Sequence, residues 1–379
     1  MLSRLNSVRL KRPREQRSCV MRVGIVAWSV HRQNVWGCRA LLVLVTGGTG
    51  YVGSHSIAAL VGAGHRIRVL ARSPEKVPAA LSPLGVHGVE TAIGDVTEPP
   101  AVERALKGCD AVLHAASVFS LGARRADEMH SVNVRGTEIV LGTAHRLGLD
   151  PIVHVSSEVA LLPPADGELL SPDSPVKRPP GPYCRSKADS ELVARKFQAL
   201  GAPVVSVLPA GVWGPHDPHL GEGVTLAANV LRNRYPIVMA GGMHVADVRD
   251  VAAVLAAVMQ PGRGPRSYLV TGHYVTMPDI IDTLGDLSGR RIRFVTLPAA
   301  FLAAFGWTAD LVQRRLRTRL PWSAESIWIV NCDARCDDSK TRDELQLEPR
   351  PLRETFADTV HWLVEAGHLT PHQAGRLAR

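Results

Sequence analysis

LLVLVTGGTGYVG, residues 41–53, is an apolar run that breaks into three glycines at Gly47, Gly50 and Gly53. Such a run ahead of a glycine-rich turn and a helical pattern predicts a buried parallel strand that feeds a helix. Glycines in that turn let the backbone approach a pyrophosphate, whose charge is met by free N–H groups and by the positive end of the helix dipole. The stretch therefore predicts a dinucleotide-binding turn, although glycine-rich turns also serve plain strand-to-helix connections.

The length and composition fit a globular protein of one two-lobed unit or two domains. The chain has 379 residues, of which 45% are hydrophobic, enough for a large core. Its net charge of +9 is concentrated in residues 1–40, which hold nine Lys and Arg and a single acid, Glu15. Without them the totals of 44 basic and 35 acidic residues fall to 35 and 34 in residues 41–379. We therefore expect no nucleic-acid partner.

Residues 1–40 are interpreted as a basic, poorly ordered N-terminal extension that takes no part in catalysis. A targeting leader, or an extension that arises from an upstream start, are the alternatives. A secretory signal is not expected, because the apolar patch after Arg22 is short and no small-residue cleavage pattern follows it.

Six cysteines lie at positions 19, 38, 109, 184, 332 and 336, without the paired spacing of a zinc site. We expect reduced thiols, no metal and a cytoplasmic location. No stretch reaches the roughly 18–20 apolar residues that a membrane-spanning helix needs. The predicted helix 299–320 has an apolar stripe and a basic end, so it could lie on a membrane surface, but such a stripe more often packs on the protein.

A second strand is predicted at 65–71, HRIRVLA, and it ends at Arg72. Arg72 lies about 20 residues past the glycines, where dinucleotide folds meet the adenosine ribose. An acid there would bind the 2′-hydroxyl of NAD, whereas a guanidinium pairs with the 2′-phosphate of NADP. Arg72 therefore favours NADP over NAD, and the alternative is an ordinary solvated arginine at a strand end.

Strands and helices alternate along the chain after the glycine turn. Helices are predicted at 51–61, 101–106 and 137–146, and strands at 90–93, 110–116, 151–155, 204–208 and 267–271. This alternation predicts an α/β fold with a parallel, doubly wound sheet. Ala115 and Ala116 are small residues at a strand end, over which a flat cofactor could lie. Residues 161–182 are expected to form a loop, and residues 209–217 a turn.

Tyr183 and Lys187 are four residues apart, so on a helix they share one face. A tyrosine with the ordinary pKa of about 10 is a poor base, but a neighbouring ammonium lowers that pKa, as does a positively charged nicotinamide. Tyr183 could then take a proton from an alcohol, or give one to a carbonyl, while hydride moves. Ser157, after the strand 151–155, could hydrogen-bond the same oxygen, and Ser156 competes with it. Taken singly, Tyr183 and Lys187 could be a pair that arises by chance in a helix, and the two serines could form a helix cap or a turn.

Taken in order, these motifs resemble those of the extended short-chain dehydrogenase/reductases, in the NAD-dependent epimerase/dehydratase family. The resemblance covers roughly residues 41–365 and rests on TGGTGYVG (46–53), GDV (94–96), HAA (114–116), NVRGT (133–137), VSS (155–157), YCRSK (183–187), AGVWGP (210–215), HVADVRDVA (244–252) and DSKTRDELQLEPRPLRETFADTVHWL (338–363). It implies a Rossmann-type doubly wound sheet with a smaller, mostly helical C-terminal substrate lobe. The dinucleotide domain is expected at 41–215, with 244–272 returning to it, and the substrate lobe at 216–243 and 273–379.

The same resemblance implies roles for individual residues. The catalytic group would be Ser157, Tyr183 and Lys187, with Asn133 in support; Lys187 would also hold the nicotinamide ribose, and Asp95 would lie near the adenine. The residues expected to bind the cofactor are Gly47, Gly50, Tyr51, Val52, Gly53, Arg72, Asp95, Val96, Ala115, Ala116, Lys187 and Pro209.

Within the family, the basic strand end and residues 267–298 look most similar to the dihydroflavonol reductase and 3β-hydroxysteroid dehydrogenase branch. That branch implies an NADP-linked interconversion of a secondary alcohol and a ketone on a mainly apolar small molecule. Sugar-nucleotide members usually continue the serine motif into Val-Tyr-Gly, whereas here it runs Glu158-Val159-Ala160-Leu161. The alternatives are an NAD-dependent sugar-nucleotide epimerase or dehydratase, and a non-catalytic NADPH-binding sensor or assembly subunit. The resemblance also allows a homodimer.

Overall fold

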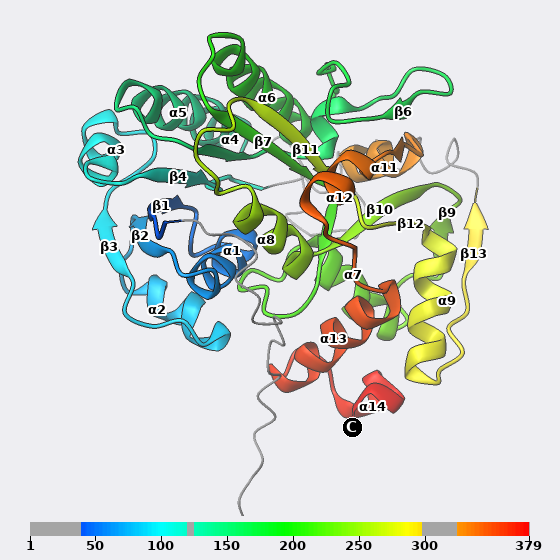
Figure 1. The fold of residues 1–379 in the computed structure, drawn as a ribbon. Helices are drawn as coiled ribbons and strands as arrows, with labels where there is room; N and C mark the ends of the chain where they lie inside the picture. Colours follow the sequence, from blue (N-terminus) through cyan, green and yellow to red (C-terminus); the bar gives the residue numbers. More distant parts are fainter. Residues whose placement is uncertain (1–38, 120–124, 298–323, 379) are drawn as a thin grey trace, which may run out of the picture. The chain divides into compact units, whose positions relative to one another are not determined.

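The central element is a sheet of seven strands, all of them parallel to their neighbours. The computed structural model describes residues 39–119, 125–297 and 324–378, and these belong to one of two compact units of the chain, Arg39–Arg379. The strands are β1 (Leu42–Thr46), β2 (Arg66–Ala71), β3 (Glu90–Ile93), β4 (Ala111–His114), β5 (Ile152–Val155), β7 (Val204–Pro209) and β11 (Arg266–Val270). Their order across the sheet is β11-β7-β5-β4-β1-β2-β3 (Figure 1), which confirms the predicted doubly wound, Rossmann-type fold.

Helices cover both faces of this sheet, because successive side chains of a strand point to opposite faces. Val43 and Val45 pack on one face, and Leu44 between them packs on the other. The first face carries α1 (Tyr51–Gly62), α2 (Lys76–Leu81) and α8 (Val248–Ala257), and the second carries α3 (Pro99–Leu106), α5 (Gly136–Arg146) and α6 (Pro182–Ala199). The strand order changes direction between β1 and β4, and ligands of open α/β sheets bind beside the carboxyl ends of strands at such a point.

Two predicted connections contain short strands. The expected turn 209–217 is wrong at β8 (Gly211–Trp213), which pairs with β10 (Gly242–Asp247), and β10 pairs in turn with β12 (His273–Thr276). The expected loop 161–182 contains β6 (Leu169–Leu170), which pairs with β14 (Arg335–Cys336). Each missed strand is short and finds its partner far along the chain, so no local alternation of apolar and polar residues marks it.

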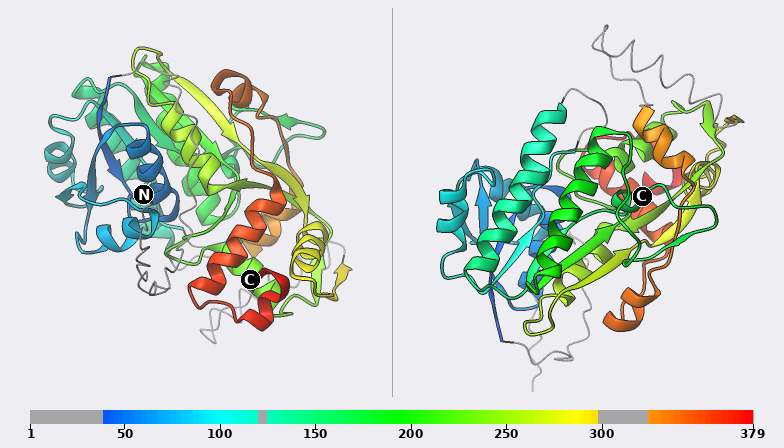
Figure 2. Two further views of the ribbon diagram at one scale, coloured as in Figure 1. Left: turned by 60° about the horizontal axis from the view of Figure 1, so that its bottom comes forward. Right: turned by 90° about the horizontal axis from the view of Figure 1, so that it is seen from above.

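A second hydrophobic cluster is built mainly from helices of the C-terminal part. Within it the rings of Trp213 and Phe356 pack at a tilt of 41°, with centroids 4.8 Å apart. The helices are α7 (Glu222–Leu231), α9 (Met277–Ser288), α11 (Ala324–Asn331), α13 (Leu352–Glu365) and α14 (Pro371–Ala374). Figure 2 shows α13 and α14, in red, beside α9, in yellow. The proposed boundaries of a substrate lobe at 216–243 and 273–379 stay a prediction.

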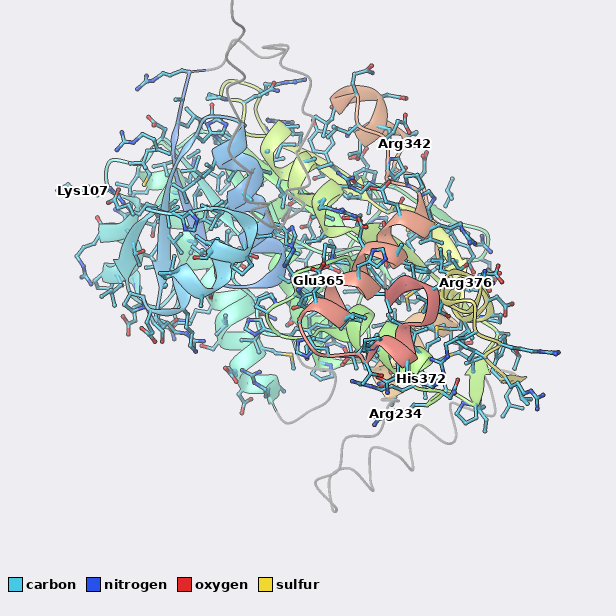
Figure 3. The ribbon with its side chains drawn as sticks, turned by 90° about the horizontal axis from the view of Figure 1, so that it is seen from below. Lys107, Arg234, Arg342, Glu365, His372 and Arg376 are labelled. Atoms are coloured by element: carbon cyan, nitrogen blue, oxygen red, sulfur yellow. The ribbon has the colours of Figure 1, made fainter. Side chains whose placement is uncertain are left out.

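The remaining elements of the described residues are short. The α-helices and strands among them are α4 (Ala126–Met129), α12 (Ser339–Leu345), β9 (Ile237–Met239) and β13 (Val295–Leu297), and four further helical segments are Ser82–Leu84, His130–Arg135, Glu158–Leu161 and Gly375–Ala378. Polar side chains lie at the surface, as Figure 3 shows for Lys107, Glu365 and His372, which are all exposed. Within the described ranges no helix is long and apolar enough to cross a membrane. The predicted helix 299–320 lies outside the described residues.

Asp247 links β10 and α8 to α13 through a buried set of hydrogen bonds. At the end of β10 it caps α8, accepting from the Arg249 backbone N–H at 2.8 Å and from the Arg249 guanidinium at 2.9 and 2.7 Å. Thr355 of α13 donates its hydroxyl to the same carboxylate at 2.8 Å. Burial alone would raise the pKa of Asp247, but the bonds from Arg249 outweigh it and lower that pKa below its ordinary value.

We expect Asp247→Asn to lower the free energy of unfolding by about 2 to 4 kcal/mol, because the Arg249 guanidinium, which also pairs with Asp358 at 2.6 Å, loses the buried carboxylate to which it donates. A carboxyl whose pKa is lowered in the folded protein stabilises it above the unfolded pKa of about 3.9, and this contribution is lost as the pH falls through the folded value. Urea titrations should therefore show that the difference in the free energy of unfolding between variant and wild type is smaller at low pH than at neutral pH.

The matched control for this prediction is Asp286→Asn. The Asp286 side chain is 74% exposed and 3.9 Å from Arg353, so its loss should change stability by less than about 0.5 kcal/mol. The role given to Asp247 would be contradicted if Asp247→Asn changed the free energy of unfolding as little as Asp286→Asn does. It would also be contradicted if the loss of stability in Asp247→Asn became larger at low pH.

Candidate active site

The glycine turn after β1 brings three chain segments together at close range. Gly47 has a φ of +70°, and a Cβ there would lie 2.6 Å from the Ala115 carbonyl group. A Cβ on Gly53 would lie 2.2 Å from the Gly47 carbonyl oxygen, to which Gly50 donates its N–H at 2.9 Å. The turn therefore holds the start of α1 close to the carboxyl ends of β1 and β4.

The N-terminus of α1 has the features of an anion site. Its N-cap is Gly50, which offers no side-chain cap, and its first turn contains no acidic residue. The first N–H groups of a helix have no acceptor within it, and they stand at the positive end of the helix dipole. The residues present thus fit a dinucleotide, whose pyrophosphate would meet these N–H groups.

Tyr51 and Val52 can contribute only main-chain groups to such a ligand. Val52 packs against the hydrophobic core. The Tyr51 ring meets the His55 ring edge-on, with centroids 5.5 Å apart, and its buried hydroxyl has no hydrogen-bond partner in the described structure. Burial, with Asp217 and Asp247 nearby, raises the Tyr51 pKa, so the phenol stays neutral.

Arg72 and Asp95 meet beyond the ends of β2 and β3. The Arg72 guanidinium is 3.7 Å from the Asp95 carboxylate, and the Arg72 side chain is 70% exposed. Asp95 is fixed by accepting the backbone N–H and the hydroxyl of Thr97, at 2.9 and 2.8 Å. Val96 lies in the core and packs against Gly136 of α5, so only its backbone can face a ligand.

Ser157, Tyr183 and Lys187 lie at the carboxyl edge of the sheet. Ser157 follows β5; its side chain lies beside the Tyr183 phenol and lowers the Tyr183 pKa, and its hydroxyl donates to the Pro209 carbonyl oxygen at 3.4 Å. Lys187, four residues after Tyr183 in α6, donates from Nζ to the Val155 carbonyl oxygen at 3.1 Å. All three side chains thus stand around the point where β5 and β7 end.

Ser156 points away from this group. Its hydroxyl lies beside Glu191, a fully buried carboxyl of α6, and lowers the pKa of that carboxyl, which burial raises. Of the two competing serines, Ser157 is therefore the one beside Tyr183.

The direction of the Tyr183 pKa differs from the expected lowering. Burial is the largest cause of a raised pKa, and Cys184 and Glu325 act in the same direction, whereas Ser157 opposes them. Burial also lowers the pKa of Lys187 to about 8. The expectation was wrong for the chain's own groups because the spacing of two residues on a helix does not reveal how far both are removed from water.

Asn133 supports the site from the π-helical segment His130–Arg135. Its side-chain oxygen accepts the Val118 N–H at 2.7 Å, and its amide donates to the Val118 carbonyl at 3.0 Å and to the Ser186 hydroxyl at 2.9 Å. Ser186 in turn donates to the Tyr183 carbonyl oxygen at 2.7 Å. Asn133 therefore ties the segment after β4 to the helix that carries Tyr183.

Three residues around Tyr183 were not predicted. The Phe119 ring meets the Tyr183 ring edge-on at 4.6 Å and is 45% exposed. Glu158 is buried directly after Ser157, its pKa is raised by burial to about 8, and the Cys336 thiol lies 3.8 Å from its carboxyl oxygen. Glu325 accepts the Cys184 N–H at 2.8 Å. Glu158 could have been predicted from its position next to Ser157, but no local sequence pattern indicates that Glu325 lies near Tyr183.

The arrangement supplies an acid–base tyrosine, a hydroxyl beside it and a cradle for a dinucleotide. Within the described residues, no group of three or more His, Cys, Asp and Glu side chains could hold a metal ion. The four described cysteines are free: Cys109, Cys184, Cys332 and Cys336. Hydride transfer to or from a bound nicotinamide is the chemistry that such a site can serve.

Residues 43–271 match the model of the NAD dependent epimerase/dehydratase family. The chain is 32% identical over 333 residues to the sterol demethylase protein B of Methylococcus capsulatus, covering 86% of this chain and 99% of that protein. It is 30% identical over 342 residues to the 4-hydroxy-2-methyl-3-oxo-4-farnesyl-3,4-dihydroquinoline-1-oxide ketoreductase of Stigmatella aurantiaca, covering 87% and 99%. Other relatives bear the names of reductases and of 3-beta-hydroxysteroid dehydrogenases, which confirms the expected resemblance.

Solved structures support the same fold. The dTDP-glucose 4,6-dehydratase DesIV of Streptomyces venezuelae, crystallised with NAD and TYD bound, superimposes with a TM-score of 0.68. The alignment covers 88% of this chain and 100% of that chain, at 23% identity. At this identity the likeness is one of fold.

Proposed function

Because this chain belongs to the NAD-dependent epimerase/dehydratase family and is an enzyme of the reductase and dehydrogenase kind, we propose that it interconverts a secondary alcohol and a ketone, with NADP as the preferred cofactor. The observation that carries the proposal is that Ser157, Tyr183 and Lys187 lie where β5 and β7 end, at the same end of the parallel sheet as the glycine turn after β1. A protein that only bound a nucleotide would have no use for an acid–base tyrosine with a hydroxyl aimed at it.

The nicotinamide, when bound, supplies or accepts the hydride. Gly47, Gly50 and Gly53 would hold the pyrophosphate of the dinucleotide against the start of α1. Tyr183 gives a proton from its hydroxyl to the substrate oxygen during reduction and takes it back during oxidation. Ser157 donates to that oxygen and orients it. Lys187, whose pKa of about 8 keeps it mainly protonated at neutral pH, offsets the charge of the phenolate.

The substrate is proposed to be mainly apolar. Phe119 presents a half-exposed ring beside Tyr183, a surface that suits an apolar molecule with one oxygen at the reacting carbon. The names of two relatives refer to a sterol and to a farnesyl-bearing quinoline. A cytoplasmic location stays a prediction.

The direct test is titration of the purified protein with NADP(H) and NAD(H), followed by a panel of ketones with the preferred cofactor. Reduction of apolar ketones supports the proposal. Tightly held NAD with no response to NADPH would favour the sugar-nucleotide epimerase or dehydratase instead. Tight cofactor binding without turnover of any alcohol or ketone would favour a nucleotide sensor.

Arg72→Ala is expected to weaken NADPH binding by about tenfold or more and to leave NADH binding nearly unchanged. The guanidinium pairs with Asp95 at 3.7 Å but is 70% exposed, so it can also donate charge-assisted hydrogen bonds to a 2′-phosphate, which are worth about 1.5 to 3 kcal/mol. Isothermal titration of both cofactors measures the two affinities.

Arg66→Ala is the matched control, since Arg66 is exposed at the amino end of the same strand, β2. It removes the same charge at the opposite edge of the sheet and should change neither affinity. Equal weakening of NADPH and NADH in Arg72→Ala would exclude a role for Arg72 in choosing the cofactor.

A further inference from the structure

Helix α6, which carries Tyr183 and Lys187, begins without a cap of its own. Its N-cap is Gly181, whose missing side chain leaves no local acceptor for the first N–H groups, and Pro182 occupies the first helical position. Helix starts are normally closed by a Ser, Thr, Asp or Asn side chain at the N-cap. The helix that bears the proposed acid–base pair therefore depends on another part of the chain.

Glu325 of α11 supplies the missing acceptor. Its carboxyl oxygen Oε1 accepts the backbone N–H of Cys184, the third residue of α6, at 2.8 Å, although the two residues are 141 positions apart. Glu325 is 6% exposed, so this contact lies in the interior. A carboxylate at a helix N-terminus also meets the positive end of the helix dipole.

The contact between Glu325 and Cys184 requires a glycine at position 181. A Cβ at Gly181 would lie 2.1 Å from Glu325 Oε1 and 2.2 Å from the carboxyl carbon. Any side chain at the N-cap would thus push the carboxylate away from Cys184. The absence of a local cap and the presence of Glu325 are two parts of one arrangement.

We propose that Glu325 is a positioning residue for Tyr183: from α11 it caps α6, fixes the first turn in which Tyr183 stands, and places a negative charge near the phenol. The inference rests on the proposed function of Tyr183 as the acid–base group. It couples the C-terminal part of the chain to the reacting edge of the sheet.

The negative charge of Glu325 acts on the pKa of Tyr183 in one direction. The titratable and polar groups around Tyr183 are Cys184 and, one turn further on, Lys187 on its own helix, Ser157 and Glu158 after β5, and Glu325 from α11. Glu325 disfavours the phenolate and raises the pKa of Tyr183. Neutralising Glu325 should therefore lower that pKa, and the limb of the pH profile of kcat that reports Tyr183 should move to lower pH.

Two variants separate the charge from the cap. Glu325→Gln keeps an oxygen acceptor for the Cys184 N–H and removes the charge, so it should move the pH profile down by about 0.5 to 1.5 pH units with hydrogen exchange in the first turn of α6 near that of wild type. Gly181→Ala displaces the carboxylate, so it should move the profile and also speed exchange in that turn by about tenfold. Exchange is followed by mass spectrometry, and kcat across pH with NADPH and a reducible ketone.

Glu354→Gln is the control, because Glu354 is a carboxylate in the first turn of α13 that pairs with Arg350 at 3.0 Å. It should move neither readout. A pH profile of Glu325→Gln that coincides with that of Glu354→Gln would overturn the electrostatic role, and unchanged exchange in Gly181→Ala would overturn the cap. If Tyr183→Phe keeps its turnover, the proposed function fails, while the exchange measurement still tests the cap.

Discussion

Replacing Tyr183 by Phe is expected to lower kcat by about 10² to 10⁴-fold, the usual contribution of a positioned general acid–base group. The ring and its edge contact with Phe119 would remain, whereas the proton donor beside Ser157 would be lost. Because the hydroxyl acts on the substrate oxygen, the affinity for NADPH should stay within about twofold of wild type. Steady-state kinetics and cofactor titration measure the two quantities.

Tyr268→Phe is the control for this prediction. Tyr268 lies on β11, buried, and donates its hydroxyl to Glu344 at 2.8 Å. The change removes one phenolic oxygen, as at Tyr183, and one hydrogen bond, but away from the reacting group, so turnover should remain. Equal turnover of Tyr183→Phe and wild type would remove the proposed mechanism.

The sheet could be predicted because its signals are local. The apolar run before Gly47 predicts the first strand, and the helical spacing of apolar residues after the glycines predicts the first helix. The later strands are marked by similar apolar runs. The meeting of Ser157 and Tyr183 also follows from local facts: parallel strands end at one edge, and the helix that carries Tyr183 begins there. What this group does is still a proposal.

The rest depends on contacts between distant segments. β8 exists only because β10 pairs with it, and its three residues carry no signal of their own. Glu325 comes from a helix far along the chain, and its meeting with Cys184 cannot be read from either local sequence. The raised pKa of Tyr183 has the same origin, since burial is its largest cause and is a property of the whole packed site.

Gly53→Ala is expected to weaken NADPH binding by about a hundredfold, equivalent to about 2.8 kcal/mol. The added Cβ would lie 2.2 Å from the Gly47 carbonyl oxygen and 2.8 Å from its carbon, so the turn has to widen. Widening moves the first N–H groups of α1 away from the position at which they can meet a pyrophosphate. Overpacking of this kind also destabilises the fold by about 1 to 3 kcal/mol. Cofactor titration and urea unfolding measure the two effects.

Gly62→Ala separates the clash from the mere addition of a methyl group. Gly62 ends the same helix, and a Cβ there would meet nothing within 4 Å. Because alanine favours a helix over glycine by up to about 1 kcal/mol, this variant should be as stable as wild type or more so, with NADPH affinity unchanged. If Gly53→Ala bound NADPH as tightly as Gly62→Ala, the close approach of α1 to Gly47 would not be what shapes the cofactor site. Loss of affinity in Gly53→Ala alone would place the pyrophosphate at this turn.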